Sequence, residues 1–271
     1  MNIRRIFLLL ILAVLMVSGA TGASAAADDG TIRSWNAEEK WQYIQFGQYM
    51  YESNGAMAPV EWRVLYVEDG KALIITEHVI DLCQPHPMDS EADYNYYKDV
   101  KHKGRLKPIM KLYEDTAIPE WFDTVMWPVL IGDDPIGAAF VDEGLGRLFC
   151  MTKEEWSRKE YGFPKKSDSA PNPARVAYVT PYVKAKRMYD WSKPMVTWEK
   201  GITGSCYWTS TMRPGNRQMQ IVGINGHLSW GGVIRPNVGI RPAAKLDLSM
   251  CEIVSGSGTE KDPYVIRYAG E

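Results

Sequence analysis

The chain has 271 residues, a net charge of −2 at neutral pH and 45% apolar residues. This length suits one large domain or two small ones. Because acidic and basic residues nearly balance and form no basic stripe, nucleic acid and an anionic membrane surface are excluded as expected partners.

The N-terminus has the three parts of a secretory signal peptide. Arg4 and Arg5 precede the apolar run IFLLLILAVLMV, and small residues at Ala23 and Ala25 follow it. The run is too short for a comfortable membrane span, which needs about 20 residues, although an uncleaved anchor is the alternative. We expect three parts: a signal peptide (1–25), a polar lead-in (26–36) and a single exported α+β domain (37–271). The product is then secreted or held at the cell surface or in the periplasm, with no membrane span after cleavage.

The first clear element is a β-hairpin. Val60, Trp62, Val64 and Tyr66 alternate with Glu61, Arg63 and Leu65, and residues 72–76 form a second, more fully apolar run. Between them lies Glu68-Asp69-Gly70-Lys71. Two such runs around an Asp-Gly pair predict a hairpin.

The middle of the chain predicts loops and short helices. Residues 83–104 are polar and aromatic and are expected to form a loop, and residues 106–127 are expected to hold one or two short helices broken by Pro119. Leu148–Met151 predicts an apolar strand. A proline-rich loop at residues 163–174 is a possible domain boundary.

A capping box follows that strand. Thr152 has Glu155 three residues later, the spacing that starts a helix, and Gly162 is a natural stop.

The C-terminal third predicts several short strands. MQIVGING and HLSWGGVI form a hairpin that turns at Asn225-Gly226, VGIRPAAKL (238–246) is one strand, and Tyr264–Tyr268 is a closing strand. Many short strands, two helices and long loops are compatible with an α+β domain.

Three motifs resemble those of a known family. They are Phe46-Gly47-Gln48-Tyr49, Glu61-Trp62-Arg63-Val64-Leu65 and Gly239-Ile240-Arg241-Pro242-Ala243. In this order they are similar to motifs of exported bacterial domains that are catalogued as a domain of unknown function. The resemblance covers most of the expected mature chain. Members of that family also carry a Ser-x-x-Arg-x-Trp-Leu-Asn helix, of which only Arg105 is left here, so the chain resembles a divergent member.

The segment from YWTST to GIRPA is also similar to the final part of the C-type-lectin-like and formylglycine-generating-enzyme-like folds. This resemblance implies an irregular α+β domain with short antiparallel strands, a few short helices and long loops. It implies further that the first and last strands pair and that the loops carry the binding surface. The cysteine context of the formylglycine-generating enzyme is missing around Cys206, so that activity is not expected here.

The four cysteines are Cys83, Cys150, Cys206 and Cys251. An even number in an exported chain permits two disulfides, with three possible connectivities. We expect one or two bridges, and the alternative is four buried thiols, because cysteine also behaves as a small hydrophobe.

Other chemistries have little support in the residue pattern. A nucleophilic pair of Cys206 and His227 would need the two side chains in contact. Cys83 and His86 offer fewer ligands than the four of a structural zinc site, so no metal or cofactor is expected. Glycosidase carboxylates cannot be selected among 33 acids without their spatial separation.

Recognition of a ligand without metal is the sharper hypothesis. Aromatic residues with planar polar side chains between them gather in the C-terminal half, and this combination suits ligands with apolar faces and hydroxyl edges. The candidate ligand-binding residues are Trp191, Trp198, Arg213, Asn216 and Trp230.

Three other conspicuous residues are expected to be structural. Trp62 and Trp208 lie in strand-like contexts and are expected in the core. Arg241 is expected to be buried and to tie loop carbonyls together, since its guanidinium is a fork of donors.

The predicted function is therefore a non-catalytic binding or interaction module outside the cytoplasm. Its expected partner is a cell-wall glycan, a host glycan or a protein. The alternatives are a hydrolase or modifying enzyme on the same scaffold and a purely structural surface protein. A binding module predicts a shallow aromatic surface, whereas an enzyme predicts a cleft with a titratable pair in contact.

Overall fold

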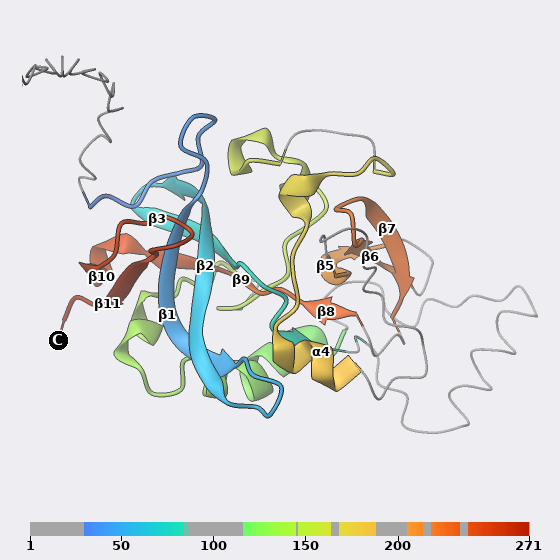
Figure 1. Cartoon of the computed structure of the whole chain (residues 1–271), viewed down its shortest axis with the longest axis horizontal. Coiled ribbons are helices and arrows are strands. Elements are labelled where there is room, and N and C mark those ends of the chain that lie inside the picture. The colour runs from blue at the N-terminus through green and yellow to red at the C-terminus, as the bar shows by residue number, and fades with distance from the viewer. Residues whose placement is uncertain are drawn as a thin grey trace, which may run out of the picture.

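The computed structural model is a mixed α+β structure, mostly strands in two sheets, with a few short helices. The structure describes residues 30–83, 85, 116–144, 146–163, 168–187, 205–213, 218–233 and 238–270. The predicted signal peptide and nearly all of the predicted loop at residues 83–104 lie outside these ranges. Figure 1 shows the larger sheet on the left and the smaller sheet on the right.

The larger sheet has six strands in the order β10-β11-β1-β2-β3-β9. They are β1 (Gln42–Met50), β2 (Met57–Glu68), β3 (Lys71–Thr76), β9 (Ala243–Asp247), β10 (Cys251–Ser255) and β11 (Tyr264–Tyr268). β1 and β11 are parallel, and the other neighbours are antiparallel. The first and last strands of the described chain are therefore paired.

The smaller sheet has five strands in the order β4-β8-β5-β6-β7. They are β4 (Asp81–Leu82), β5 (Tyr207–Met212), β6 (Gln218–Val222), β7 (Leu228–Gly232) and β8 (Gly239–Ile240). β5 and β8 are parallel, and the other pairs are antiparallel. β7 forms one edge of this sheet.

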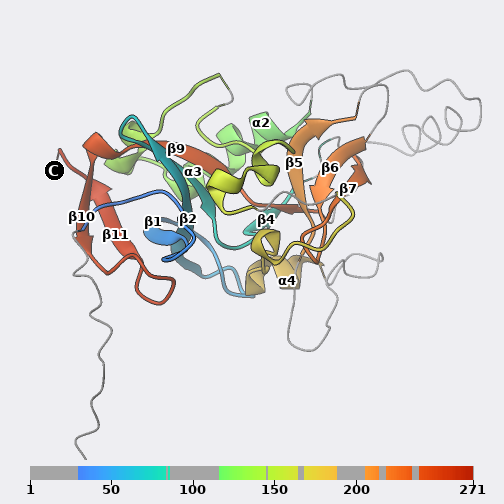
Figure 2. The ribbon, with the colours of Figure 1, turned by 90° about the horizontal axis from the view of Figure 1, so that it is seen from above.

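Short helical segments fill the connections. They are α2 (Ile118–Trp121), the π-helix η2 (Phe122–Met126), α3 (Trp127–Leu130), the 3₁₀ turns η3 (Pro135–Ala139), η4 (Glu155–Ser157), η5 (Lys159–Tyr161), η6 (Pro173–Arg175) and η7 (Leu248–Met250), and α4 (Pro181–Arg187). The view in Figure 2 places α2 and α4 on opposite sides of the molecule.

Both hairpins predicted from Asp-Gly and Asn-Gly pairs are confirmed. β2 and β3 pair up to Glu68 and Lys71, with Asp69 at φ 50° and Gly70 at φ 73° between them. Two positive φ angles in succession make the tight turn whose twist suits a hairpin. The hairpin of β6 and β7 around Asn225-Gly226 and the closing strand β11 are also confirmed.

The capping box is confirmed in both directions. The amide of Glu155 donates to Thr152 Oγ1 (3.2 Å), and the amide of Thr152 donates to Glu155 Oε2 (2.7 Å). The helix that it starts is a 3₁₀ turn, and Gly162 ends the next turn at φ 84°.

Three predictions about elements were wrong in detail. Pro119 lies in the first turn of α2 and begins a helix rather than breaking one, because proline lacks only an amide that the first turn leaves unused. Leu148–Met151 makes one isolated bridge, Phe149 with Ala243, and no strand.

Residues 238–246 are two strands rather than one. β8 belongs to the smaller sheet and β9 to the larger sheet, with Arg241 and Pro242 between them. The chain crosses from one sheet to the other at this point.

The core has two apolar clusters. Trp62 and Trp208 belong to the first and are fully buried, as predicted. The second lies around Leu65, Trp156 and Tyr207. Arg63 and Leu65 on β2 are buried as well as Trp62 and Val64, because both faces of this strand are covered.

Gly47 explains part of the Phe-Gly-x-Tyr motif. It has φ 67°, and a Cβ there would lie 2.6 Å from the carbonyl oxygen of Leu130. Only glycine allows α3 to approach β1 this closely. The phenylalanine of the motif, Phe46, stacks on Trp62 at 5.1 Å between ring centroids.

Candidate functional site

Two of the predicted ligand-binding residues lie together on the smaller sheet. Arg213 is exposed at the end of β5, and its Cζ lies 5.6 Å from the centre of the Trp230 ring on β7. Arg213 Nη1 donates to Gln218 Oε1 (3.0 Å), and the Arg213 amide donates to the Gln218 carbonyl (2.9 Å). We call this pair the Arg213–Trp230 surface. Trp191, Trp198 and Asn216 lie outside the described residues.

The Trp230 ring lies at the rim of a buried layer. Leu228 and Trp230 share one face of β7, since side chains two residues apart point the same way. Leu228 is buried in the second apolar cluster, whereas Trp230 is only half-buried. Along this face of the edge strand β7, burial therefore falls from Leu228 in the core to Trp230 near the solvent.

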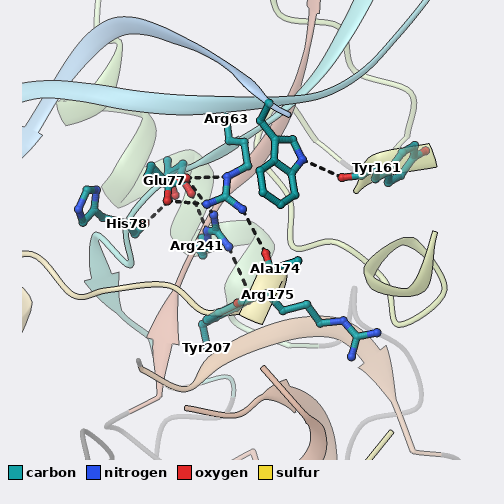
Figure 3. Close-up of polar contacts among 10 residues, drawn as sticks. Arg63, Glu77, His78, Tyr161, Ala174, Arg175, Tyr207 and Arg241 are labelled. Atoms are coloured by element: carbon teal, nitrogen blue, oxygen red, sulfur yellow. Dashed lines mark hydrogen bonds and ion pairs between the residues drawn. The ribbon is translucent and has the colours of Figure 1, made fainter. Parts of the chain in front are cut away.

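A buried charge network lies between the sheets (Figure 3). Glu77 accepts hydrogen bonds from Arg63 Nε (2.7 Å) and Nη2 (2.5 Å), and it lies 3.6 Å from Arg241 Nη2. Arg63 Nη1 also donates to the Ala174 carbonyl (3.1 Å). Arg63 lies under Trp41, with its Cζ 4.2 Å from the ring centre. One carboxylate thus neutralises part of the charge of two buried guanidinium groups.

Arg241 is buried, as predicted, and its contacts are with one backbone carbonyl, a hydroxyl and a carboxylate. It is 1% exposed, and its Nε donates to the Thr76 carbonyl (2.6 Å). Its Nη1 reaches the Tyr207 hydroxyl (3.4 Å), which itself donates to the Arg175 carbonyl (2.6 Å). Burial lowers the pKa of Arg241 and raises that of Tyr207 to about 12. The Tyr207 hydroxyl therefore stays protonated at neutral pH.

The predicted disulfides are not found. Cys83, Cys150, Cys206 and Cys251 form no disulfide in the structure. The first three are buried in the first apolar cluster and Cys251 packs against it, so all four occupy the positions of small hydrophobic residues. Burial raises the pKa of Cys83, and it raises that of Cys251 to about 11, so neither is a ready thiolate.

His227 faces Asn225 rather than a cysteine. Its Nδ1 makes a short contact with Asn225 Oδ1, and its ring packs over Gly223. Cys206 is 4% exposed within the core. These positions do not support the nucleophile hypothesis.

Reasoning from the sequence missed a cavity beside the two central strands β1 and β2 of the larger sheet. Its volume is about 250 Å³, and it lies beside β1, β2 and the residue that precedes α4. The polar residues on its wall include Gln45, Glu61, His78 and Thr180. The alternation along β2 carried a signal, because it places Glu61 on the same face as Arg63. No hydrogen bond joins Glu61 to His78 among the contacts of the described residues.

No family model, no curated protein and no solved structure matches the chain. Among the described residues there is no group of three or more metal-binding side chains. Within those same ranges, no helix is long and apolar enough to cross a membrane.

Proposed function

We propose that the chain is a non-catalytic binding module outside the cytoplasm, and that the Arg213–Trp230 surface is the centre of its ligand site. The observation that carries this proposal is the exposed Arg213 beside the half-buried ring of Trp230 on an edge strand. An arginine held near an indole fixes a planar group of donors next to an apolar face.

The ligand that suits this surface is a glycan or a protein segment. A sugar ring has one apolar face for the indole and hydroxyl groups at its edge for the guanidinium. The same pair is frequent at protein interfaces, where tryptophan and arginine contribute much of the binding energy. Trp191, Trp198 and Asn216 are proposed to extend the site.

We also propose that the architecture is C-type-lectin-like. The pairing of β1 with β11 supports this, because the resemblance in the sequence implies that the first and last strands pair. Trp230 lies on the edge strand β7 and Arg213 approaches it from the end of β5, which agrees with a binding surface carried by that part of the fold.

A binding screen tests the proposal. The purified chain is tested against a glycan array, insoluble peptidoglycan and host glycoproteins, beside Trp230→Ala and Arg213→Ala. We expect each substitution to weaken binding of a captured ligand by about tenfold or more, the usual effect of removing a central tryptophan or arginine. Trp121→Ala, at a half-buried tryptophan in α2, and Arg267→Ala, at an exposed arginine in β11, are the matched controls.

Two results would contradict the proposal. One is the absence of binding to every ligand class in the screen. The other is binding that both variants of the Arg213–Trp230 surface retain at the strength of the controls.

A further inference from the structure

The cavity beside Glu61 is separate from the Arg213–Trp230 surface. Gln45 on β1 pairs directly with Glu61 on β2, so their side chains are neighbours on one face of the larger sheet. Arg63 follows two residues later on the same face and is held by Glu77. This face therefore passes from a buried ion pair to a carboxylate at the cavity.

Glu61 is not paired by the buried charge network of Arg63, Glu77 and Arg241. The cation on its own face, Arg63, already makes two hydrogen bonds to Glu77. The Glu61 side chain has no hydrogen bond or ion pair with another described residue, although it is half-buried. Burying an ionised carboxylate costs free energy unless a cation pairs with it. A cationic ligand could be that partner for Glu61.

Three residues with acceptor groups in their side chains line the cavity. They are Glu61, Gln45 and His78. In Figure 3 the His78 ring points away from the two arginines, and it meets the Tyr51 ring edge to face at 6.4 Å. An ammonium group has three donors and no acceptor, so it matches this set.

The charges around the cavity favour a cation. Burial and the charges of Glu77 and Glu260 raise the pKa of Glu61 to about 7, against the opposite effect of Arg63. Burial lowers the pKa of His78, which keeps its ring neutral and able to accept a hydrogen bond at neutral pH. A bound cation would favour the ionised form of Glu61.

We propose that this cavity binds the primary ammonium group of a ligand, with Glu61 as its counter-ion. The volume of about 250 Å³ is that of roughly eight water molecules, which suits an amine on a short alkyl chain. A bare divalent metal fits less well, because the described residues provide no group of three metal-binding side chains. The walls formed by Tyr49, Tyr51 and Ile80 suit the alkyl part.

NMR titration at pH 8 tests the proposal with three probes. They are n-pentylamine, n-pentanol as its neutral analogue, and Nα-acetyl-lysine amide as an amine carried by a peptide. We expect saturable shifts at His78 and Glu61 with at least one amine and none with the alcohol. The pair of amines shows whether a free amine or a lysine side chain is preferred. We expect binding at pH 5.5 to be weaker by about tenfold or more, since Glu61 is then mostly protonated.

Glu61→Gln keeps the shape of the side chain and removes its charge. It should weaken amine binding at pH 8 by about tenfold or more. Glu68→Gln, at an exposed position near the other end of β2, should leave the affinity unchanged. The proposal fails if neither amine saturates the wild-type cavity, if the alcohol binds as well as the amines, or if Glu61→Gln binds them undiminished. The carboxyl pKa of Glu61, followed in the same spectra, must also fall when the amine is added.

Discussion

At the scale of single residues, Glu61 makes the stability of the chain depend on pH. Its pKa in the folded chain is about 7, above its usual value of 4.5, with burial as the largest cause. The folded state therefore binds a proton that the unfolded state has lost between these two values. Stability that is present at acidic pH is lost as the pH rises through this window.

Glu61→Gln should remove this dependence. We expect the variant to have a higher thermal midpoint than the parent at pH 8 and nearly the same midpoint at pH 4, because the parent side chain is neutral there too. Thermal unfolding followed from pH 4 to pH 8 measures the effect, with Glu68→Gln as the control. Parallel pH profiles for Glu61→Gln and the parent would show that Glu61 has no raised pKa.

The candidate residues show what a sequence reveals at this scale. The burial of Trp62, Trp208 and Arg241 followed from their strand contexts and from the chemistry of guanidinium. Glu61 was one acid among 33. Its importance depends on the nearby cation, Arg63, being hydrogen-bonded to Glu77 rather than to Glu61. The order of residues in the sequence does not show which partner a side chain will lack in the folded structure.

At the scale of elements, the predictable parts are those with local causes. The hairpin at Asp69-Gly70 and the capping box at Thr152 are set by residues within a few positions of each other. The pairing of β1 with β11 joins segments more than 200 residues apart, and no local pattern specifies it. Residues 238–246 were predicted as one strand because their division is also set by distant partners. The first half pairs within the smaller sheet and the second half within the larger sheet.

The two hairpin turns allow a matched prediction about glycine. Gly70 has φ 73° and open space around it, whereas Gly226 has φ 77° and a Cβ there would lie 1.9 Å from the carbonyl oxygen of Asn172. Gly70→Ala should cost about 1–2 kcal/mol of unfolding free energy, the backbone strain alone. Gly226→Ala should cost more, because the clash also disturbs the hydrogen bond from the Asn172 amide to Asn225 (2.9 Å).

Chemical denaturation of the two alanine variants measures this difference. An excess cost of about 1 kcal/mol or more for Gly226→Ala is expected from displacing packed backbone. Equal costs would mean that residues 172–175 do not rest on the second hairpin.

At the scale of the whole molecule, the buried charge network joins the two sheets. Arg63 and Glu77 lie on and just after strands of the larger sheet, and Arg241 lies in the crossover between β8 and β9. Arg241 contacts Thr76 at the end of β3 and Tyr207 in β5. The apolar clusters can tolerate small shifts, whereas these hydrogen bonds fix how one sheet is positioned against the other.

Glu77→Gln tests this role, because it leaves two buried guanidinium groups without their counter-ion. Removing one partner of a buried ion pair typically costs about 3–5 kcal/mol, and we expect a loss of that order in urea unfolding.

Glu143 is the matched control. It also contacts two cations, Lys71 and Lys245, but on the surface, where solvent screens such pairs. Glu143→Gln should leave the unfolding free energy nearly unchanged. If the two variants unfold at the same urea concentration, the network does not stabilise the packing of the sheets. If Glu77→Gln instead unfolds in two separate transitions, the loss of cooperativity would show directly that Glu77 couples one sheet to the other.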